Sequence, residues 1–237
     1  MKKIIIKGFI TLIVLFLLLL GTYKLMNSRT YQFFGGLTNH VETNKKVVAL
    51  TFDDGPTSNV KQIIPLLDKY HAKATFFLIG IELENNPWEG QRIAEAGHQI
   101  GNHTYIHKYL IFKSPSVIKR EIERTNQLIR KTGYDGEIVF RPPFGKKLVL
   151  LPYYLKIHNM QTVTWDLEPD TYYTSVSDKV NYVDRNVKPG SIILMHPMYD
   201  DTGNELKATE GILKHLSSEG YKFVTVDELQ QTATSHK

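Results

Sequence analysis

Two adjacent carboxylates follow one apolar run of the sequence. Asp53 and Asp54 come directly after residues 46–52 (KVVALTF), whose apolar and β-branched side chains predict a buried strand. Adjacent carboxylates repel each other unless one is neutralised, and a divalent metal ion does this most simply. Asp-Gly-Pro is also ordinary turn chemistry, so this motif taken alone is read first as a polar turn.

Two histidines stand four positions apart in the sequence HTYIH. On one face of a helical turn, His103 and His107 would bring two imidazoles toward one ion. Nine histidines in this length make a chance pair a real alternative, in which these residues are capping or surface groups. Together with a carboxylate at a neighbouring strand end, the pair predicts an Asp-His-His site. Three protein ligands leave one position open for water, as in catalytic zinc sites.

Two further ionisable side chains follow apolar runs. Arg141 opens the segment RPPFG, and an arginine at a strand end can pair with a carboxylate and keep it ionised. The alternative for Arg141 is a purely structural salt bridge. His196 ends the run ILMH and can act as a general acid if a carboxylate tunes its pKa, the alternative being a hydrogen-bonded core histidine. The candidate carboxylates are Asp166, Glu168 and Asp170.

The segments that carry these residues alternate between strand and helix patterns. Strands are predicted over 46–52, 74–79, 98–101, 138–140, 161–165, 191–195 and 222–226, and helices over 60–71, 88–96, 116–132, 146–158, around 180 and over 204–218. About seven βα-type units with short connections imply a parallel sheet covered by helices, either a barrel or a doubly wound sheet. In a barrel the carboxyl ends of the strands meet at one face, so we expect one shared site.

The N-terminal segment has the composition of a membrane signal. Residues 8–23 are uncharged and mostly aliphatic or aromatic, and lysines precede them. The run is slightly shorter than the roughly 20 residues of a spanning helix, and the lysines favour an N-terminus on the cytoplasmic side. A cleaved signal peptide is the alternative, but residues 21–29 contain no small-x-small cleavage site. We therefore expect a retained anchor over 1–29, a linker over 30–45 and an extracytoplasmic catalytic domain over 46–237.

Charge and cysteine content exclude several classes of protein. The 237 residues carry a formal charge of +5, but five basic residues precede the first acid, Glu42, and the remaining acidic and basic side chains balance. The basic excess therefore comes from the N-terminus and does not predict a nucleic-acid interface. The absence of cysteine excludes a disulfide framework, a thiolate zinc site and a cysteine nucleophile.

In this order, the motifs TFDDGPTSN, HTYIH, RPPFG and LMH resemble those of polysaccharide deacetylases of the NodB-homology type, carbohydrate esterase family four. The resemblance covers about residues 46–229. It implies an α/β fold, a distorted (β/α)7 barrel, here preceded by an N-terminal transmembrane segment. It also implies one divalent metal ion, zinc in the first place, with cobalt, nickel or manganese as alternatives. The implied reaction is hydrolytic removal of N-acetyl, or sometimes O-acetyl, groups from a polysaccharide.

The resemblance assigns roles to the metal site and the residues beside it. Asp53 matches the general base of the family. Asp54, His103 and His107 match its metal ligands. Arg141 matches the arginine that orients the base.

The resemblance also assigns the acid side of the site. His196 matches the general acid, and Leu194 matches the leucine that lines the acetyl pocket. Phe144 replaces the usual tyrosine, whose backbone N–H contributes to the oxyanion hole, so a backbone donor is retained. The carboxylate that pairs with the acid is expected to be Asp170 and, as second choice, Asp166, because the spacing after the preceding Trp is about one residue short.

An extracytoplasmic anchor favours a cell-envelope polysaccharide such as peptidoglycan over chitin or xylan. We expect a monomer that binds polysaccharide and membrane and no nucleic acid. An O-acetyl esterase of the same fold is one alternative. A membrane-tethered carbohydrate-binding pseudoenzyme is another, which the full set of matching residues disfavours.

Overall fold

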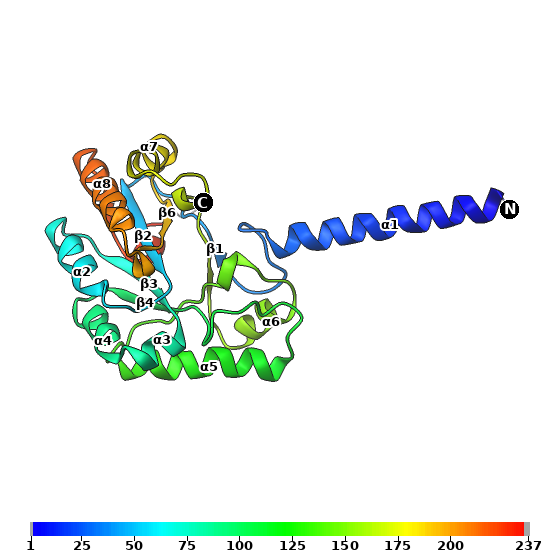
Figure 1. Ribbon diagram of the computed structural model, residues 1–237, viewed down its shortest axis with the longest axis horizontal. Coiled ribbons are helices and arrows are strands. Elements are labelled where there is room, and N and C mark those ends of the chain that lie inside the picture. The colour runs from blue at the N-terminus through cyan, green and yellow to red at the C-terminus, as the bar shows by residue number, and fades with distance from the viewer. Residues whose placement is uncertain (1, 235–237) are drawn as a thin grey trace.

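The computed structural model describes residues 2–234 and shows an α/β body from which one long helix projects (Figure 1). The strands are β1 (Leu37–Thr38), β2 (Val47–Asp53), β3 (Ala74–Leu78), β4 (Gln99–Asn102), β5 (Thr162–Val163), β6 (Ile192–Met195) and β7 (Lys222–Phe223). The α-helices are α1 (Lys2–Met26), α2 (Val60–Lys69), α3 (Gly80–Asn85), α4 (Pro87–Glu95), α5 (Pro115–Lys131), α6 (Leu150–Ile157), α7 (Val176–Asn186), α8 (Asn204–Ser218) and α9 (Val226–Gln230).

The strands pair in parallel, as the alternating pattern predicts. Their order is β4-β3-β2-β6, with β7 on β2 and a separate pair formed by β1 and β5. Single parallel bridges join Asn102 to Phe140, Phe140 to Thr162 and Leu167 to Ile193. The α/β class is therefore confirmed. Within residues 2–234, however, continuous strand ladders do not close into a ring, so the closed barrel is not established by the pairing.

The central strand β2 explains why its end carries the chemistry. All seven of its residues are buried: one face packs against residues of α2 and α8, and the other against a cluster contributed mostly by neighbouring strands. It pairs with β3, β6 and β7. Its last residue, Asp53, therefore enters the site from the middle of the sheet and from a rigid backbone.

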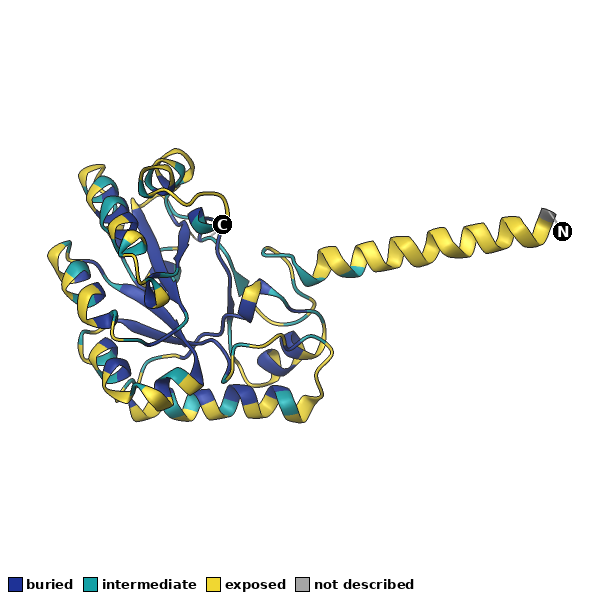
Figure 2. Cartoon of the chain, viewed as in Figure 1, coloured by how far each residue is buried: buried dark blue, intermediate teal, exposed yellow. Residues whose placement is uncertain are grey.

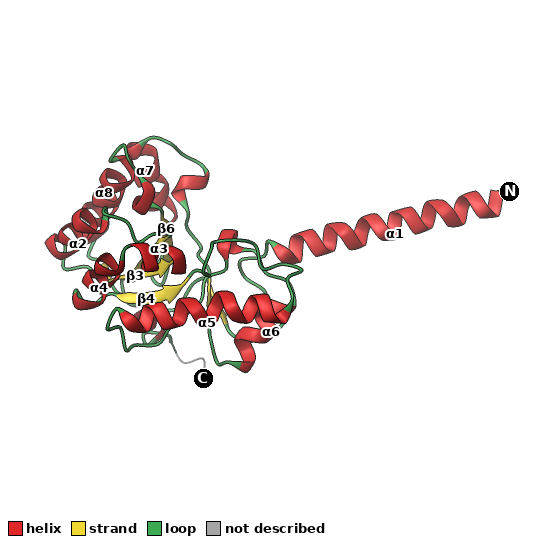
Figure 3. Cartoon of the chain, turned by 60° about the horizontal axis from the view of Figure 1, so that its bottom comes forward, coloured by secondary structure: helices red, strands yellow, loops and turns green. Residues whose placement is uncertain are grey.

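The helices cover the sheet with one apolar face each (Figures 2 and 3). In α5, Ser114 caps the first turn by accepting from the Val117 N–H, and isoleucines at helical spacing face the core. The three clusters of buried apolar side chains all lie between residues 41 and 229. The body therefore has a complete core without α1.

Helix α1 has the properties of a membrane span by length and composition. Within Lys3–Met26, an 18-residue window has a mean hydropathy of 2.8, and none of that window is buried against the body. A signal sequence near an N-terminus has the same properties. Figure 2 shows its exposed surface along almost its whole length.

Several boundaries differ from the sequence-based expectations for local reasons. The segment 30–45, expected as a linker, contributes β1, which pairs with β5. The strand expected at 138–140 is reduced to a single bridge residue, Phe140. The helix expected from 146 begins at Leu150, and the strand expected at 222–226 ends early because Thr225 and Glu228 form a capping box that starts α9.

Candidate active site

The two adjacent carboxylates point in different directions. Asp53 ends β2 and is buried, whereas Asp54 takes a left-handed backbone conformation with φ of 75°. Aspartate tolerates this region better than most residues. The turn therefore sends Asp53 toward Arg141, 2.7 Å from Oδ1 to Nη1, and Asp54 toward the histidines.

Asp54, His103 and His107 form a compact group of metal-ligating atoms, all within 4.8 Å of one another. The two Nε2 atoms lie 3.1 Å apart, and His107 Nε2 lies 3.4 Å from Asp54 Oδ1. His103 donates from Nδ1 to the Arg141 carbonyl at 2.7 Å, which leaves its Nε2 free to ligate. Asp54 Oδ1 is buried and has no hydrogen-bond partner among the described residues. These atoms therefore fit one divalent cation.

The segment 103–107 is not the helical turn that the spacing suggested. Thr104 and His107 both have positive φ, 69° and 53°, so the segment is an irregular loop. Glu121, buried on α5, accepts hydrogen bonds from the backbone N–H groups of Tyr105 and Ile106 at 3.1 and 3.0 Å. The Glu121 carboxylate therefore holds the loop in place. The two imidazoles come together because of this tertiary contact and not because of helical spacing.

Arg141 is fully buried and its guanidinium contacts several elements. It donates to Asp53 at 2.7 Å, to the Thr51 hydroxyl at 2.8 Å and to the Thr164 carbonyl at 3.0 Å. It also lies 3.9 Å above the ring of Phe77. Burial alone would raise the pKa of Asp53, but the charges of Arg141 and His103 hold that pKa below the ordinary value of an aspartate. Asp53 is therefore an ionised carboxylate at neutral pH.

A second acid-base group lies at the end of β6. His196 Nδ1 lies 3.0 Å from Asp170 Oδ2. Burial lowers the pKa of His196, but the hydrogen bond to Asp170 and the nearby charge of Asp53 raise it to about 9. Asp170 is also paired with Lys179, 2.9 Å away, and Lys179 in turn contacts Glu205. His196 is therefore held in its protonated form at neutral pH.

Comparison with known proteins identifies the family. Residues 40–163 match the family model described as polysaccharide deacetylase. A peptidoglycan-N-acetylglucosamine deacetylase of Bacillus cereus is 36% identical over 199 residues, which cover 82% of this chain and 93% of that protein. The chain belongs to the polysaccharide deacetylase family. The sequence-based assignment is thus confirmed.

Solved structures agree with this polysaccharide deacetylase fold and include an inactive relative. The crystal structure of the Bc1960 peptidoglycan N-acetylglucosamine deacetylase is 33% identical, with a TM-score of 0.77, over 84% of this chain and 94% of that one. A family-four pseudoenzyme from Bacillus anthracis, BA3943, is 28% identical with a TM-score of 0.73, over 82% and 69%. Because a pseudoenzyme shares this fold, the fold alone does not establish catalysis, which depends on the side chains of the site.

In this deacetylase the carboxylates after Trp165 have separate positions. Asp170 lies against His196 and is thus the partner that was expected as first choice. Asp166 instead accepts from the Ile192 N–H at 2.7 Å and from Ser191 at 2.8 Å, and lies 3.0 Å from His40 Nδ1. Asp166 therefore fastens the loop to β6 and does not reach the site.

Glu168, the third candidate carboxylate, does not face solvent. It accepts from Arg29 at 2.7 Å and from the Trp165 indole at 3.0 Å. Glu168 thus fixes the start of the loop that carries Asp170, and its replacement is expected to affect the position of that loop.

Leu194 and Phe144 are the remaining two residues that were expected at the site. Leu194 is buried in β6, two residues before His196. Phe144 has φ of 59° and is half exposed, and its ring lies 4.8 Å from that of His107. Its side chain thus forms one wall beside the metal-ligating group.

The sequence reasoning missed Glu121, Lys179 and Glu205. A signal for Glu121 existed, because it occupies the apolar face of α5 between isoleucines, where an unpaired acid would be costly. Lys179 and Glu205 lie on α7 and α8 and gave no comparable signal. Their role depends on the packing of those two helices.

Proposed function

We propose that this chain is a metal-dependent hydrolase that removes N-acetyl groups from a cell-envelope polysaccharide such as peptidoglycan. We also propose that single bridges complete the distorted (β/α)7 barrel, that the catalytic domain extends over 46–237, and that α1 is a retained anchor. The enzyme would then act outside the cytoplasmic membrane as a single-pass protein.

The observation that carries the proposal is the combination of three groups at the carboxyl ends of the strands. These groups are the Asp54–His103–His107 cluster, the Asp53–Arg141 pair and the His196–Asp170 pair. Asp53 and His103 are also close, 3.5 Å between Oδ2 and Nε2. A protein that only binds carbohydrate does not need an ionised base and a protonated acid beside one group of metal-ligating side chains.

The cluster would hold one divalent cation, and two imidazoles with one carboxylate suit zinc. A cation at this site supplies Lewis acidity and lowers the pKa of water. Asp53, ionised and oriented by Arg141, would accept a proton from the attacking water. The new bond joins the water oxygen to the acetyl carbon.

The acid side completes the hydrolysis. The Phe144 N–H would donate to the oxygen that gains negative charge at the acetyl carbon. His196 would donate its proton to the amide nitrogen as the carbon–nitrogen bond breaks, which releases acetate and the free amine. Asp170 keeps His196 protonated before that step, and buried Leu194 would contact the acetyl methyl group.

The substrate class rests on the relatives. The Bacillus cereus protein, which this chain matches over 93% of that protein's length, is a peptidoglycan-N-acetylglucosamine deacetylase. An apolar N-terminal helix agrees with an envelope location. We therefore propose peptidoglycan as the substrate, N-acetylglucosamine as its reacting sugar and a monomer as the working unit.

Product analysis tests the proposal. Purified protein is incubated with peptidoglycan, chitin oligomers and acetylated xylan, and acetate and free amine are measured with and without chelator. We expect acetate and amine in equal amounts from peptidoglycan, loss of both with chelator and recovery with zinc or cobalt. Acetate without amine indicates an O-acetyl esterase. Binding without any release in the presence of metal indicates a pseudoenzyme.

A further inference from the structure

The end of α1 is fastened to the body with no free linker between them. Lys147 donates from its backbone to the Met26 carbonyl at 3.1 Å and from its buried ammonium to the Ser28 carbonyl. Arg29 pairs with Glu168 at 2.7 Å. These contacts begin at the last residue of the helix, so they fix which face of the body lies beside a bilayer that contains α1.

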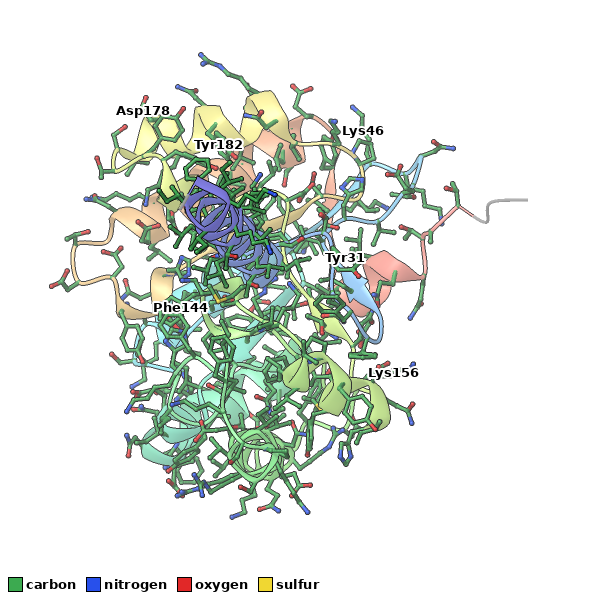
Figure 4. All side chains as sticks on the ribbon, turned by 90° about the vertical axis from the view of Figure 1, so that its right-hand side faces the viewer. Tyr31, Lys46, Phe144, Lys156, Asp178 and Tyr182 are labelled. Atoms are coloured by element: carbon green, nitrogen blue, oxygen red, sulfur yellow. The ribbon has the colours of Figure 1, made fainter. Side chains whose placement is uncertain are left out.

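That face includes the metal-ligand side of the candidate active site. A hollow of about 570 Å³ is lined by Met26 from the end of α1 and by His107 and Phe144 from the candidate site, together with Tyr109 and Phe112. Figure 4, viewed toward the side from which α1 projects, places Phe144 on the side facing the viewer. The metal-ligating group and the end of the helix therefore open onto the same surface.

The loop beside this hollow presents apolar side chains to solvent. Phe112 is 82% exposed, and Tyr109 and Ile106 are 45% and 37% exposed. Phe112 has φ of 57°, a conformation that is uncommon for a bulky residue and that places it at a turn. Because Ile106, Tyr109 and Phe112 lie on one loop, they form an exposed apolar patch, which is typical of a contact surface.

Basic side chains predominate around the end of α1, where Arg29 neutralises the acid Glu168. Residues 1–41, 96–120 and 138–165, which supply this region, contain no aspartate or glutamate, although the catalytic body as a whole is balanced in charge. We call Ile106, Tyr109 and Phe112, together with the flanking Lys108, Lys113 and Lys146, the anchor-side face. Aromatic side chains beside lysines match the headgroup region of an anionic bilayer.

We propose that the anchor-side face rests on the anionic outer surface of the bilayer, so that the His107 and Phe144 side of the active site opens toward the membrane. The inference rests on the anchoring proposed above. The 25 residues of α1 span about 37 Å, against about 30 Å of hydrocarbon, so Lys24 and Met26 lie at headgroup level. The hollow that Met26 lines then lies at the same level, and Phe112 inserts between headgroups.

A glycan subsite is the competing explanation for the same residues. Phe112 lines the hollow, but it is also the most exposed large apolar side chain of the body, so most of its surface is left open to another partner. The continuity with α1 and the absence of acids from the three segments named above also favour a lipid surface. Loss of affinity for chitin oligomers in Phe112→Ser would indicate a glycan subsite instead.

Vesicle binding by residues 27–237 tests the face without the anchor, since the body keeps its whole core. We expect sedimentation with phosphatidylglycerol vesicles, weakening in high salt, and none with phosphatidylcholine vesicles. Phe112→Ser should lower binding about tenfold and Lys113→Glu about fivefold. Matched controls are Trp88→Ser, 73% exposed on α4, and Lys131→Glu at the end of α5. The proposal is overturned if residues 27–237 do not bind phosphatidylglycerol vesicles, or if the two control variants lose as much vesicle binding as the test variants. It is also overturned if Phe112→Ser loses affinity for chitin oligomers.

The full chain in proteoliposomes separates this proposal from the anchor. The chain has no cysteine, so Phe112→Cys and Trp88→Cys each accept one fluorophore. Lipids with a quencher near the headgroup should quench the label at 112 and not the label at 88. Anchored protein with no quenching at 112 refutes the membrane contact alone. A cleaved N-terminus with vesicle binding by the body refutes the anchor alone.

Discussion

Replacing Asp170 by asparagine removes a charge from beside His196 while keeping a side-chain oxygen that can accept from Nδ1. The carboxylate lies 3.0 Å from that nitrogen and is held ionised by His196 and Lys179, although burial alone would raise its pKa. The pKa of His196, about 9, depends on Asp170 and on the more distant Asp53. Loss of one adjacent charge lowers such a pKa by roughly 1–2 units.

The sign of the effect follows from the role of His196 as a proton donor. Activity needs the protonated form, so the rate falls as pH rises through the pKa of His196. In Asp170→Asn the alkaline limb of the kcat profile should move down by roughly 1–2 pH units. The rate at pH 6 should be nearly retained, and the rate at pH 9 should fall on the order of tenfold. Both enzymes are compared with metal bound, so the charge of the cation is common to them.

The assay is acetate release from a soluble chitin oligomer between pH 5 and 10. Asp166→Asn is the matched control: it removes a carboxylate that binds Ile192 and Ser191, so it should lower the melting temperature without moving the limb. Asp170→Asn combined with His196→Ala should add little to His196→Ala alone. An unmoved limb in folded Asp170→Asn, an equal shift in Asp166→Asn or additive losses in the double variant would refute the reasoning.

Four further outcomes are expected. Asp53→Asn should keep its metal and lose kcat with little change in KM, as metal analysis and kinetics would show; loss of metal would mean that Asp53 is a ligand. His107→Ala should weaken metal binding by at least about tenfold in a competition titration. Arg141→Ala should lower the free energy of unfolding in urea by about 3–5 kcal/mol, because it leaves a buried carboxylate unpaired. Burial lowers the pKa of His98 to about 4, so the unfolded state binds more protons and stability should fall as pH drops from 6.5 toward 4, a dependence that His98→Phe should reduce.

The sequence predicted those parts of the molecule that depend on local pattern. Strands β2 and β3 and helix α5 lie within one or two residues of their expected bounds, because continuous apolar runs and helical spacing report burial directly. The site residues at the ends of β2 and β6 followed from the same pattern. Helix α3 and strand β1 were missed because six and two residues are too short for a period to be recognised.

The geometry within the site needed tertiary information. The histidine loop is irregular because Glu121, from another element, holds two of its N–H groups. The choice between Asp170 and Asp166 depends on which of them the loop turns toward β6, and both follow Trp165 closely in sequence. Lys179 reaches Asp170 only because α7 packs beside the site, so no spacing in the sequence could indicate it.

The contacts between the end of α1 and the body also bear on which part of the glycan is modified. Met26, Ser28 and Arg29 are each hydrogen-bonded to the body, and the Arg29 carbonyl accepts from Thr164 at 2.6 Å. A body of about 200 residues has a radius of gyration of about 16 Å, so with α1 retained as the proposed anchor the molecule would work only in the layer next to the bilayer. Polymer that lies farther from the bilayer would be beyond its reach. Deacetylation by this enzyme would therefore be confined to glycan close to the membrane, and the degree of deacetylation would depend on how long each chain stays there.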